Sequence, residues 1–208
     1  AWLIRQMQKL GVKVVMNTEA TPELIASLEP DAIVCALGSS AVMPRIEGID
    51  HKKCVSCVDA LTDESIVGKR VVVVGGGLVG CELSLDLINK GHDVTIVEAL
   101  PAILSSGIGV PYPNIEYLGD AFVDHQTPVL TSTRIAAVND EGAVVEDADG
   151  KKTIPADTVI IAVGFSPTPS IAEAVKGIGA AVYEIGDQRQ VGNILTSIWD
   201  AYEVARTL

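Results

Sequence analysis

Three glycines and one acidic residue are the positions of this sequence whose types and spacing best suit a chemical role. Gly75, Gly77 and Gly80 form a GxGxxG pattern, and Glu98 follows at the end of the next apolar segment. In such a pattern the first glycine permits a tight turn, the second leaves room for a pyrophosphate, and the third lets a helix pack closely on a strand. The pattern predicts a dinucleotide-binding site formed by Gly75, Gly76, Gly77, Leu78, Val79, Gly80 and Glu98.

The segments around the glycines predict the strand, helix and strand that such a site needs. Residues 71–74 are all valine, and residues 94–97 are apolar except for Thr95, which is typical of parallel strands buried on both faces. Residues 78–90 have apolar positions at helical spacing, and Gly91 ends them. The helix would present backbone N–H groups and the positive end of its dipole to the phosphates. A GxGxxG pattern in this setting is far more specific than the pattern alone.

Glu98 favours NADH over NADPH. Its carboxylate would accept hydrogen bonds from the ribose hydroxyls and would repel a 2′-phosphate. The sequence has no lysine or arginine between Lys90 and Arg134, so no neighbouring residue is expected to receive that phosphate. Glu82 has two interpretations, either a solvated residue on the polar face of the helix or a first-turn acid near the nicotinamide ribose.

Further elements flank this unit. The segments DAIVCALG and DTVIIAVG, at residues 31–38 and 157–164, have the same pattern of a leading aspartate, an apolar core and a final glycine. Each is expected to be a buried strand. The other expected elements are a helix at 2–10, a strand at 12–16, a short helix from Thr21, a loop at 105–114, antiparallel strands within 129–154, a strand at 180–187, and a helix at 193–208 that buries Ile194, Ile198, Tyr202 and Ala205.

Composition narrows the function classes. A formal net charge of −12 argues against a nucleic-acid partner, which would require a basic surface. No apolar run approaches the roughly 20 residues of a membrane helix, and Arg5 and Lys9 interrupt the N-terminal segment, unlike a secretory signal. We therefore expect no membrane partner and a cytoplasmic location. The sequence opens within a predicted helix, so we expect a piece of a longer protein whose exposed apolar surface could support a homo-oligomer.

The segment HKKCVSC leaves three interpretations open. His51, Cys54 and Cys57 have spacing that suits a metal half-site, a redox dithiol or merely incidental thiols. The metal interpretation lacks a second ligand pair, and no metal site is predicted. Cys35 and Cys81 lie in apolar segments and are expected to pack in the core.

With the glycine-rich unit between the two Asp-to-Gly strands, and EIGD before the final helix, the sequence resembles the two-dinucleotide flavoprotein reductases. It is most similar to the C-terminal half of the 2,4-dienoyl-CoA reductase and 2-enoate reductase family, NADH:flavin oxidoreductases that include trimethylamine dehydrogenase. The resemblance implies an α/β fold in which a Rossmann-like NAD-binding domain, residues 68–162, is inserted in a truncated FAD-binding domain made of residues 1–67 and 163–208.

The resemblance also implies site residues and a reaction. Gly38 and Gly164 correspond to strand-end glycines near the FAD and at the domain crossover, and Gly186 and Asp187 to a Gly-Asp pair whose acid hydrogen-bonds the FAD ribityl chain. Leu37 stands where the family usually has threonine. The family's first GxGxxG, which holds the FAD pyrophosphate, is absent from this sequence, so the isolated chain is expected to bind NADH weakly and to retain little FAD.

In the parent enzyme, a hydride would pass from NADH to FAD, and electrons would continue through a [4Fe-4S] cluster to an FMN that reduces the C=C bond of an enoate or dienoyl-CoA. The FMN and iron–sulfur barrel lies outside this sequence and is the expected partner, so no catalytic residue is assigned here. Two alternatives are an NADH-dependent disulfide or ferredoxin-type reductase that uses Cys54 and Cys57, and a non-catalytic NAD-binding module.

Overall fold

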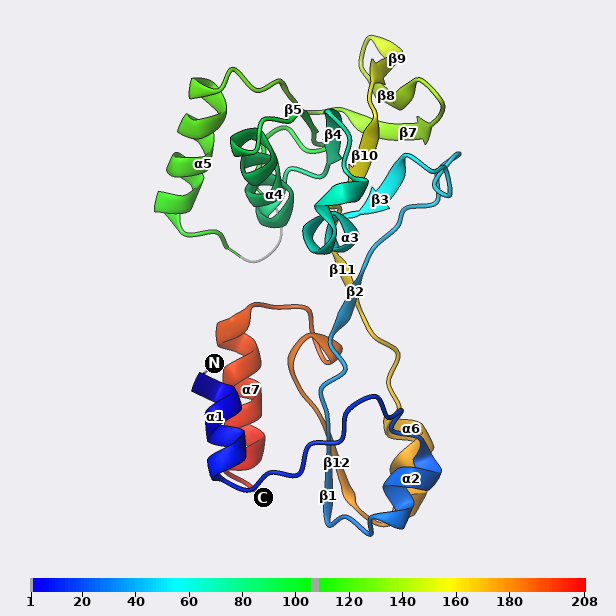
Figure 1. Ribbon diagram of the computed structural model, residues 1–208, viewed down its shortest axis with the longest axis vertical. Helices are drawn as coiled ribbons and strands as arrows, with labels where there is room; N and C mark the ends of the chain where they lie inside the picture. The colour runs from blue at the N-terminus through cyan, green and yellow to red at the C-terminus, as the bar shows by residue number, and fades with distance from the viewer. Residues whose placement is uncertain (1, 106–108) are drawn as a thin grey trace.

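The chain forms two lobes joined by a two-stranded ribbon (Figure 1). The computed structural model describes residues 2–105 and 109–208. The ribbon pairs β2 (Ser39–Ala41) with β11 (Phe165–Pro167) in antiparallel fashion. The chain therefore crosses from the smaller lobe to the larger one through β2 and returns through β11. Within the described part of the chain, no helix has the length and apolar character needed to cross a membrane.

The larger lobe is built on a five-stranded parallel sheet in the order β3-β10-β4-β5-β6. Neighbouring residues along β4 contribute to two different cores, Val71 and Val73 to one and Val72 and Val74 to the other. Side chains of a strand alternate between the two faces of a sheet, so both faces are covered. The strands are β3 (Cys54–Ser56), β4 (Arg70–Val74), β5 (Asp93–Val97), β6 (Val129–Leu130) and β10 (Thr158–Ile161).

Different layers cover the two faces of this sheet. One core includes residues from helices α3 (Cys57–Thr62), α4 (Leu78–Asn89) and α5 (Tyr112–Asp124), with the short 3-10 helix η1 (Glu64–Ile66) following α3. The other core includes residues from an antiparallel sheet of β7 (Arg134–Val138), β8 (Gly142–Asp147) and β9 (Gly150–Pro155). This double coverage explains why the predicted strands at 71–74 and 94–97 are almost entirely apolar.

The smaller lobe pairs β1 (Ala32–Cys35) with β12 (Ala181–Glu184) in parallel. Its core is small and centres on Ile33, Cys35 and Val175. The remaining elements of this lobe are α1 (Trp2–Lys9), α2 (Pro22–Ser27), α6 (Ala172–Val175), η2 (Lys176–Ile178), η3 (Gly186–Gln188) and α7 (Ile194–Ala205).

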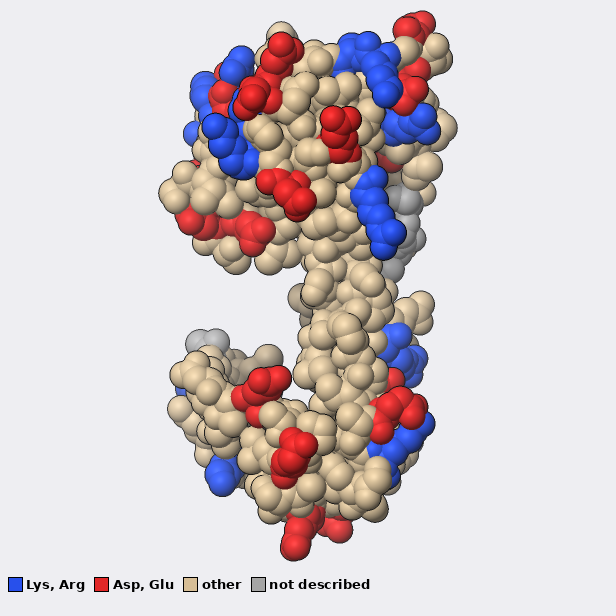
Figure 2. Space-filling model, turned by 90° about the vertical axis from the view of Figure 1, so that its right-hand side faces the viewer, with Lys and Arg blue, Asp and Glu red and all other residues tan. Residues whose placement is uncertain are grey.

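The carboxyl ends of both sheets open on the space beside the ribbon. β1 runs into Gly38 and β2, whereas β10 runs into Gly164 and β11, so each sheet sends one strand directly into the ribbon. Because the neighbouring strands are parallel, β4 and β5 end on the same side as β10, and β12 ends on the same side as β1. Seen from the side, the molecule is hollowed between the lobes at this level (Figure 2).

Three predicted elements differ in the structure. No strand forms at 12–16, where Val14, Val15 and Met16 are exposed and have no hydrogen-bonded neighbouring strand within the described chain. Helix α5 begins at Tyr112, inside the loop predicted for 105–114, and Pro113 sits in its first turn as a helix-start signal; residues 106–108 of that loop lie outside the described residues. β6 pairs in parallel with β5 and not in an antiparallel sheet, because it extends the glycine-rich unit.

The face of α7 that was predicted to be buried is exposed. A capping box between Asn193 and Thr196 starts the helix as expected, but Ile194, Ile198 and Tyr202 are 80%, 59% and 64% exposed, and Ala205 is exposed as well. Helical periodicity identifies a face that favours packing, but it does not supply the element that packs there.

The sheet of the larger lobe also includes a strand from before residue 68, where the NAD-binding domain was predicted to begin. β3 pairs with β10 through Cys54, Val55 and Ser56. We therefore propose a division at the ribbon, with residues 42–164 in the larger lobe and the rest in the smaller one.

Candidate functional site

The bend between β4 and α4 is shaped by glycines that no other residue could replace. Gly75 has φ of +113°, and a Cβ on it would lie 2.3 Å from the carbonyl oxygen of Ala162. A Cβ on Gly80 would lie 1.9 Å from the carbonyl oxygen of Gly75. The first glycine thus makes the turn and the last one brings the helix against the bend, as the sequence pattern predicts.

Gly77 differs from these two glycines because space surrounds it. It is the N-cap of α4, and an added Cβ would meet no atom within 4 Å. No side chain caps the helix at this residue, so the N–H groups of Leu78 and Val79 in the first turn face outward from the end of the helix dipole. Backbone donors at a helix start, with an open approach over a glycine, suit a phosphate group.

Glu98 lies against the same bend. Its side chain is 8% exposed, and its carboxylate accepts hydrogen bonds from the N–H of Gly76 at 2.6 Å and from the N–H of Leu100 at 2.7 Å. The N–H of Leu104 donates to the carbonyl oxygen of Gly76 at 2.7 Å. Two backbone donors hold the carboxylate at the carboxyl end of β5, which is the position that the sequence predicts for the ribose-binding acid.

Two further residues of α4, Cys81 and Glu82, lie close to this bend in the sequence. Glu82 is exposed and lies just after the first turn of the helix, and its role near the nicotinamide ribose stays a prediction. Cys81 is fully buried behind the bend, and burial, with the negative charges of Glu98 and Glu82 in addition, raises the pKa of its thiol to about 12. Cys81 therefore remains a neutral packing residue, as its apolar context predicts.

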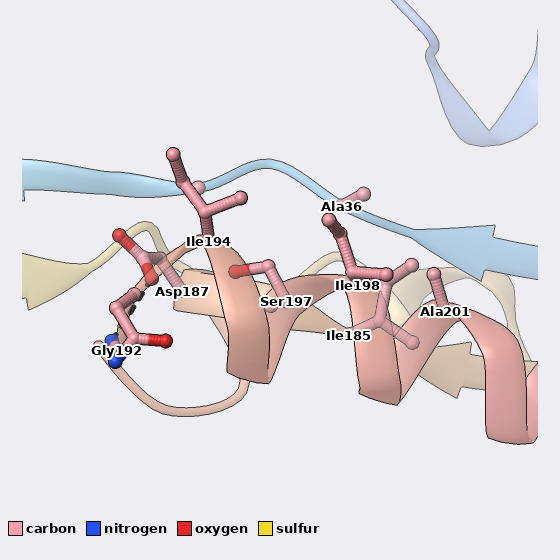
Figure 3. Close-up of a pocket in the computed structure, with 11 residues that line it drawn as sticks. Ala36, Ile185, Asp187, Gly192, Ile194, Ser197, Ile198 and Ala201 are labelled. Atoms are coloured by element: carbon pink, nitrogen blue, oxygen red, sulfur yellow. Dashed lines mark hydrogen bonds between the residues drawn. The ribbon is translucent and has the colours of Figure 1, made fainter.

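A second pocket lies in the smaller lobe, between the carboxyl ends of β1 and β12 and the first half of α7 (Figure 3). Its volume is about 600 Å³. Apolar side chains make most of its wall, and Asp187 and Ser197 contribute polar atoms. The lining residues include Ala36, Gly38, Ile185, Gly186, Asp187, Gly192, Ile194, Ser197, Ile198 and Ala201.

Hydrogen bonds fix the polar end of this pocket. The Asp187 carboxylate accepts from the Ser39 hydroxyl at 3.0 Å and from the N–H of Gly192 at 3.0 Å. Gly186, with φ of +63°, donates its N–H to Asp200 at 3.1 Å. A fixed carboxylate at one end of an apolar cavity suits a ligand with an apolar body and a hydrogen-bond donor that reaches the carboxylate.

Gly38 and Gly164 are placed at the two ends of the ribbon. The carbonyl oxygen of Gly164 accepts from the N–H of Val42, and that of Gly38 accepts from the N–H of Thr168. Both have positive φ, +73° at Gly38 and +117° at Gly164, which turns each strand out of its lobe. Gly38 also lines the pocket, whereas Gly164 does not.

Sequence reasoning missed two residues near these sites. Ser39 holds Asp187, and its position directly after a strand-end glycine was the available signal. Arg134 lines a cavity of about 260 Å³ together with Ala99, the residue after Glu98. The sequence between Lys90 and Arg134 contains no lysine or arginine, but the chain returns to the neighbourhood of Ala99 through β7.

The structure places Cys54 and Cys57, the pair of the dithiol interpretation, in different cores. Cys57 belongs to the core on the helical face of the parallel sheet, whereas Cys54 packs against the core on the opposite face. Burial raises the pKa of both thiols. His51 contacts Asp140 at 3.2 Å instead, and the described residues contain no group of three side chains that could hold a metal ion.

The pattern of the family described as "Pyridine nucleotide-disulphide oxidoreductase" matches residues 23–189. Cinnamate reductase of Clostridium sporogenes is 35% identical over all of this chain, and bilirubin reductase of Mediterraneibacter gnavus is 30% identical over all of it. Among solved structures, that of 2-naphthoyl-CoA reductase matches 97% of this chain with a TM-score of 0.87 and 32% identity. The match covers 30% of the reductase chain.

The chain spans about a third of the curated relatives that it matches, 31% of the cinnamate reductase and 32% of the bilirubin reductase. A water-forming NADH oxidase from Lactobacillus brevis, solved with bound NADH, shares the fold over 85% of this chain with a TM-score of 0.66 and 18% identity.

Proposed function

Because the chain belongs to the pyridine nucleotide-disulphide oxidoreductase family, we propose that it is the NADH- and FAD-binding part of a larger flavoprotein oxidoreductase. In this role it receives NADH on the larger lobe and directs a hydride to a flavin held by the smaller lobe. The family and its relatives support an oxidoreductase, and the assignment of the two lobes rests on the sites described above.

One observation carries the proposal. The glycine bend lies at the carboxyl end of β4, the pocket beside Asp187 lies at the carboxyl end of β12, and both ends open on the space beside the ribbon. Ligands of open α/β sheets bind at the carboxyl ends of the strands. Two such sites that open on the same space suit NADH and FAD, because these two groups must come into contact for a hydride to pass between them.

On the larger lobe, the N–H groups of Leu78 and Val79 donate to the pyrophosphate, which approaches over Gly77. Gly75, Gly76 and Gly80 shape the bend. Glu98 accepts hydrogen bonds from the adenosine ribose hydroxyls with the lone pairs that Gly76 and Leu100 leave available, and its negative charge disfavours a 2′-phosphate. NADH is therefore the preferred coenzyme.

On the smaller lobe, Asp187 accepts hydrogen bonds from the ribityl chain of FAD, and Gly38 and Gly186 let the backbone approach it. Gly164 holds the crossover of the ribbon. When bound, FAD would supply the redox chemistry, taking up two electrons and a proton as hydride from NADH and passing the electrons onward. The residues of this chain supply orientation, and none of them is assigned a proton transfer.

The substrate class of the whole protein is an activated C=C bond. Two relatives, cinnamate reductase and 2-naphthoyl-CoA reductase, support reduction of an unsaturated acid or its CoA thioester. We propose enoate reduction, with dienoyl-CoA as a related substrate, at an FMN and [4Fe-4S] barrel in the remaining two thirds of the parent protein. A cytoplasmic location and a homo-oligomer complete the proposal. The placement of Cys54 and Cys57 in separate cores argues against the disulfide-reductase alternative.

Anaerobic titration of the full-length protein with NADH tests this function. The expected result is bleaching of the flavin absorbance that is complete only after more than one equivalent of NADH per FAD, because electrons pass on to the FMN and the [4Fe-4S] cluster, and retention of the bleached state until an enoate such as cinnamate is added. NADH binding without bleaching would instead support a non-catalytic NAD-binding module. A protein that binds no NADH would refute the proposal.

A further inference from the structure

A small cavity next to Ala99, the residue after Glu98, is lined by an arginine, Arg134, that has no role in the proposed NADH site. Its lining consists of Ala99, Ser132, Arg134, Glu146 and Asp147, and its volume is about 260 Å³. Two strands of the antiparallel sheet, β7 and β8, form one side, and the residue that follows Glu98 forms the other. The cavity is separate from the glycine bend but adjoins the acid proposed to bind ribose.

The backbone fixes the cavity to that acid. The N–H of Thr133 donates to the carbonyl oxygen of Glu98 at 2.9 Å, and the N–H of Ser132 donates to the carbonyl oxygen of Leu100 at 2.9 Å. These two bonds join the residues on either side of Ala99 to the segment that leads into β7. Arg134 follows directly in the chain, so its position relative to Glu98 is set by main-chain contacts and not by a flexible loop.

The guanidinium in this cavity is already engaged. Arg134 donates to one Glu146 carboxylate oxygen through Nη2 at 2.9 Å and through Nε at 3.3 Å. The two residues are direct partners across β7 and β8. Asp147 adds a second carboxylate, which is paired with Lys152 at 2.6 Å. The cation is thus neutralised by the residue opposite it.

Coenzyme choice between NADH and NADPH depends on what a 2′-phosphate would meet. Arginine is the side chain best suited to bind such a phosphate, through a two-pronged hydrogen bond. Here Arg134 lines a cavity together with Ala99, the residue after the proposed ribose-binding acid, but its donors are directed to Glu146. Releasing Arg134 from this pair would leave the cation available to a phosphate on the same ribose.

We propose that Glu146 is a specificity-determining residue, which holds Arg134 away from the 2′ position and so excludes NADPH together with Glu98. This inference rests on the proposed NADH site and extends it to a residue pair on the antiparallel sheet. Glu98 repels the additional phosphate directly, whereas Glu146 acts by occupying the only guanidinium that lines the cavity in the described structure.

Calorimetric binding of two non-reducing ligands, ADP-ribose and 2′-phospho-ADP-ribose, to the full-length protein tests this inference. Glu146→Gln should raise the affinity for the phosphorylated ligand relative to ADP-ribose by about three- to fivefold, because an exposed arginine pair contributes up to about 1 kcal/mol. The double variant with Arg134→Gln should return the ratio to that of the parent protein.

Glu141→Gln is the matched control. Glu141 lies in the turn between the same two strands, outside the cavity, and its replacement removes the same charge. An equal change in Glu141→Gln and Glu146→Gln, or no change in either, would overturn the role of Glu146 while leaving NADH binding intact. A parent protein that binds neither ligand would instead overturn the proposed function and this inference together.

Discussion

Replacing Gly77 by alanine should weaken NADH binding and leave the fold intact. Gly77 has φ of −73° and ψ of −179°, which any residue adopts, and an added Cβ would contact no atom within 4 Å. Alanine reduces the freedom of the unfolded chain but is a poorer helix N-cap than glycine. These two effects oppose each other, so we expect the free energy of unfolding to change by at most about 0.5 kcal/mol.

The effect on binding follows from the same open space. The methyl group would project where the pyrophosphate must approach the first turn of α4, and forcing an extra methyl group into a close contact costs about 1–3 kcal/mol. The dissociation constant for NADH should therefore rise by about five- to 150-fold. Calorimetric titration with NADH and thermal unfolding, both on the full-length protein, give the two quantities separately.

Gly119→Ala provides the control for this variant. Gly119 lies in α5, where an added Cβ also meets no atom within 4 Å. Alanine should stabilise that helix by up to about 1 kcal/mol and leave NADH binding unchanged. If Gly77→Ala binds NADH as tightly as Gly119→Ala while both remain folded, the pyrophosphate does not cross Gly77 and the site is wrongly placed.

Three further predictions concern stability and thiol chemistry. Gly80→Ala should lower the melting temperature markedly, because its Cβ would lie 1.9 Å from a backbone carbonyl oxygen of the bend; an unchanged melting temperature would contradict this close contact. The Arg70 guanidinium and its hydrogen bonds lower the pKa of Asp157 to about 2, so the stability that this pair contributes is present above about pH 4 and is lost as the pH falls toward 2. Asp157→Asn should be less stable at neutral pH and should show a weaker loss of stability across that range, as measured by urea unfolding at each pH; parallel curves for the two proteins would count against the pair. Mild oxidation of the native protein should not remove two thiols reversibly, since Cys54 and Cys57 pack in separate cores; a reversible loss in thiol titration would revive the dithiol interpretation.

Local sequence signals predict the glycine bend well because its geometry depends on neighbouring residues. A strand, three spaced glycines and a helix define where Gly75, Gly77 and Gly80 must lie, and the structure gives the first and last of them the close contacts expected. Glu98 follows from the same reasoning, since the returning parallel strand ends beside the one that carries the glycines.

Residues brought in from distant parts of the sequence could not be placed in this way. Arg134 reaches the neighbourhood of Glu98 only because β7 begins beside Ala99, and no periodicity within β7 reports that contact. β3 joins the parallel sheet through pairing with β10, which lies about a hundred residues later in the sequence. Such pairings depend on the packing of the whole sheet, not on local propensity.

Amphipathic patterns have a related limit. The apolar stripe of α7 and the valines of 12–16 favour burial, yet Ile198 and Val15 are exposed in the structure. A strand forms only where a partner strand supplies hydrogen bonds, and an apolar helix face is buried only where another element covers it. Sequence therefore identified these faces correctly as apolar but did not predict their exposure.

The most direct test of the central claim is a crystal structure of the full-length protein with bound NADH. The account predicts that the pyrophosphate lies over Gly77, within hydrogen-bonding distance of the N–H groups of Leu78 and Val79, with the adenosine ribose on the Glu98 carboxylate. A dinucleotide bound elsewhere, with Gly77 covered by protein, would contradict it.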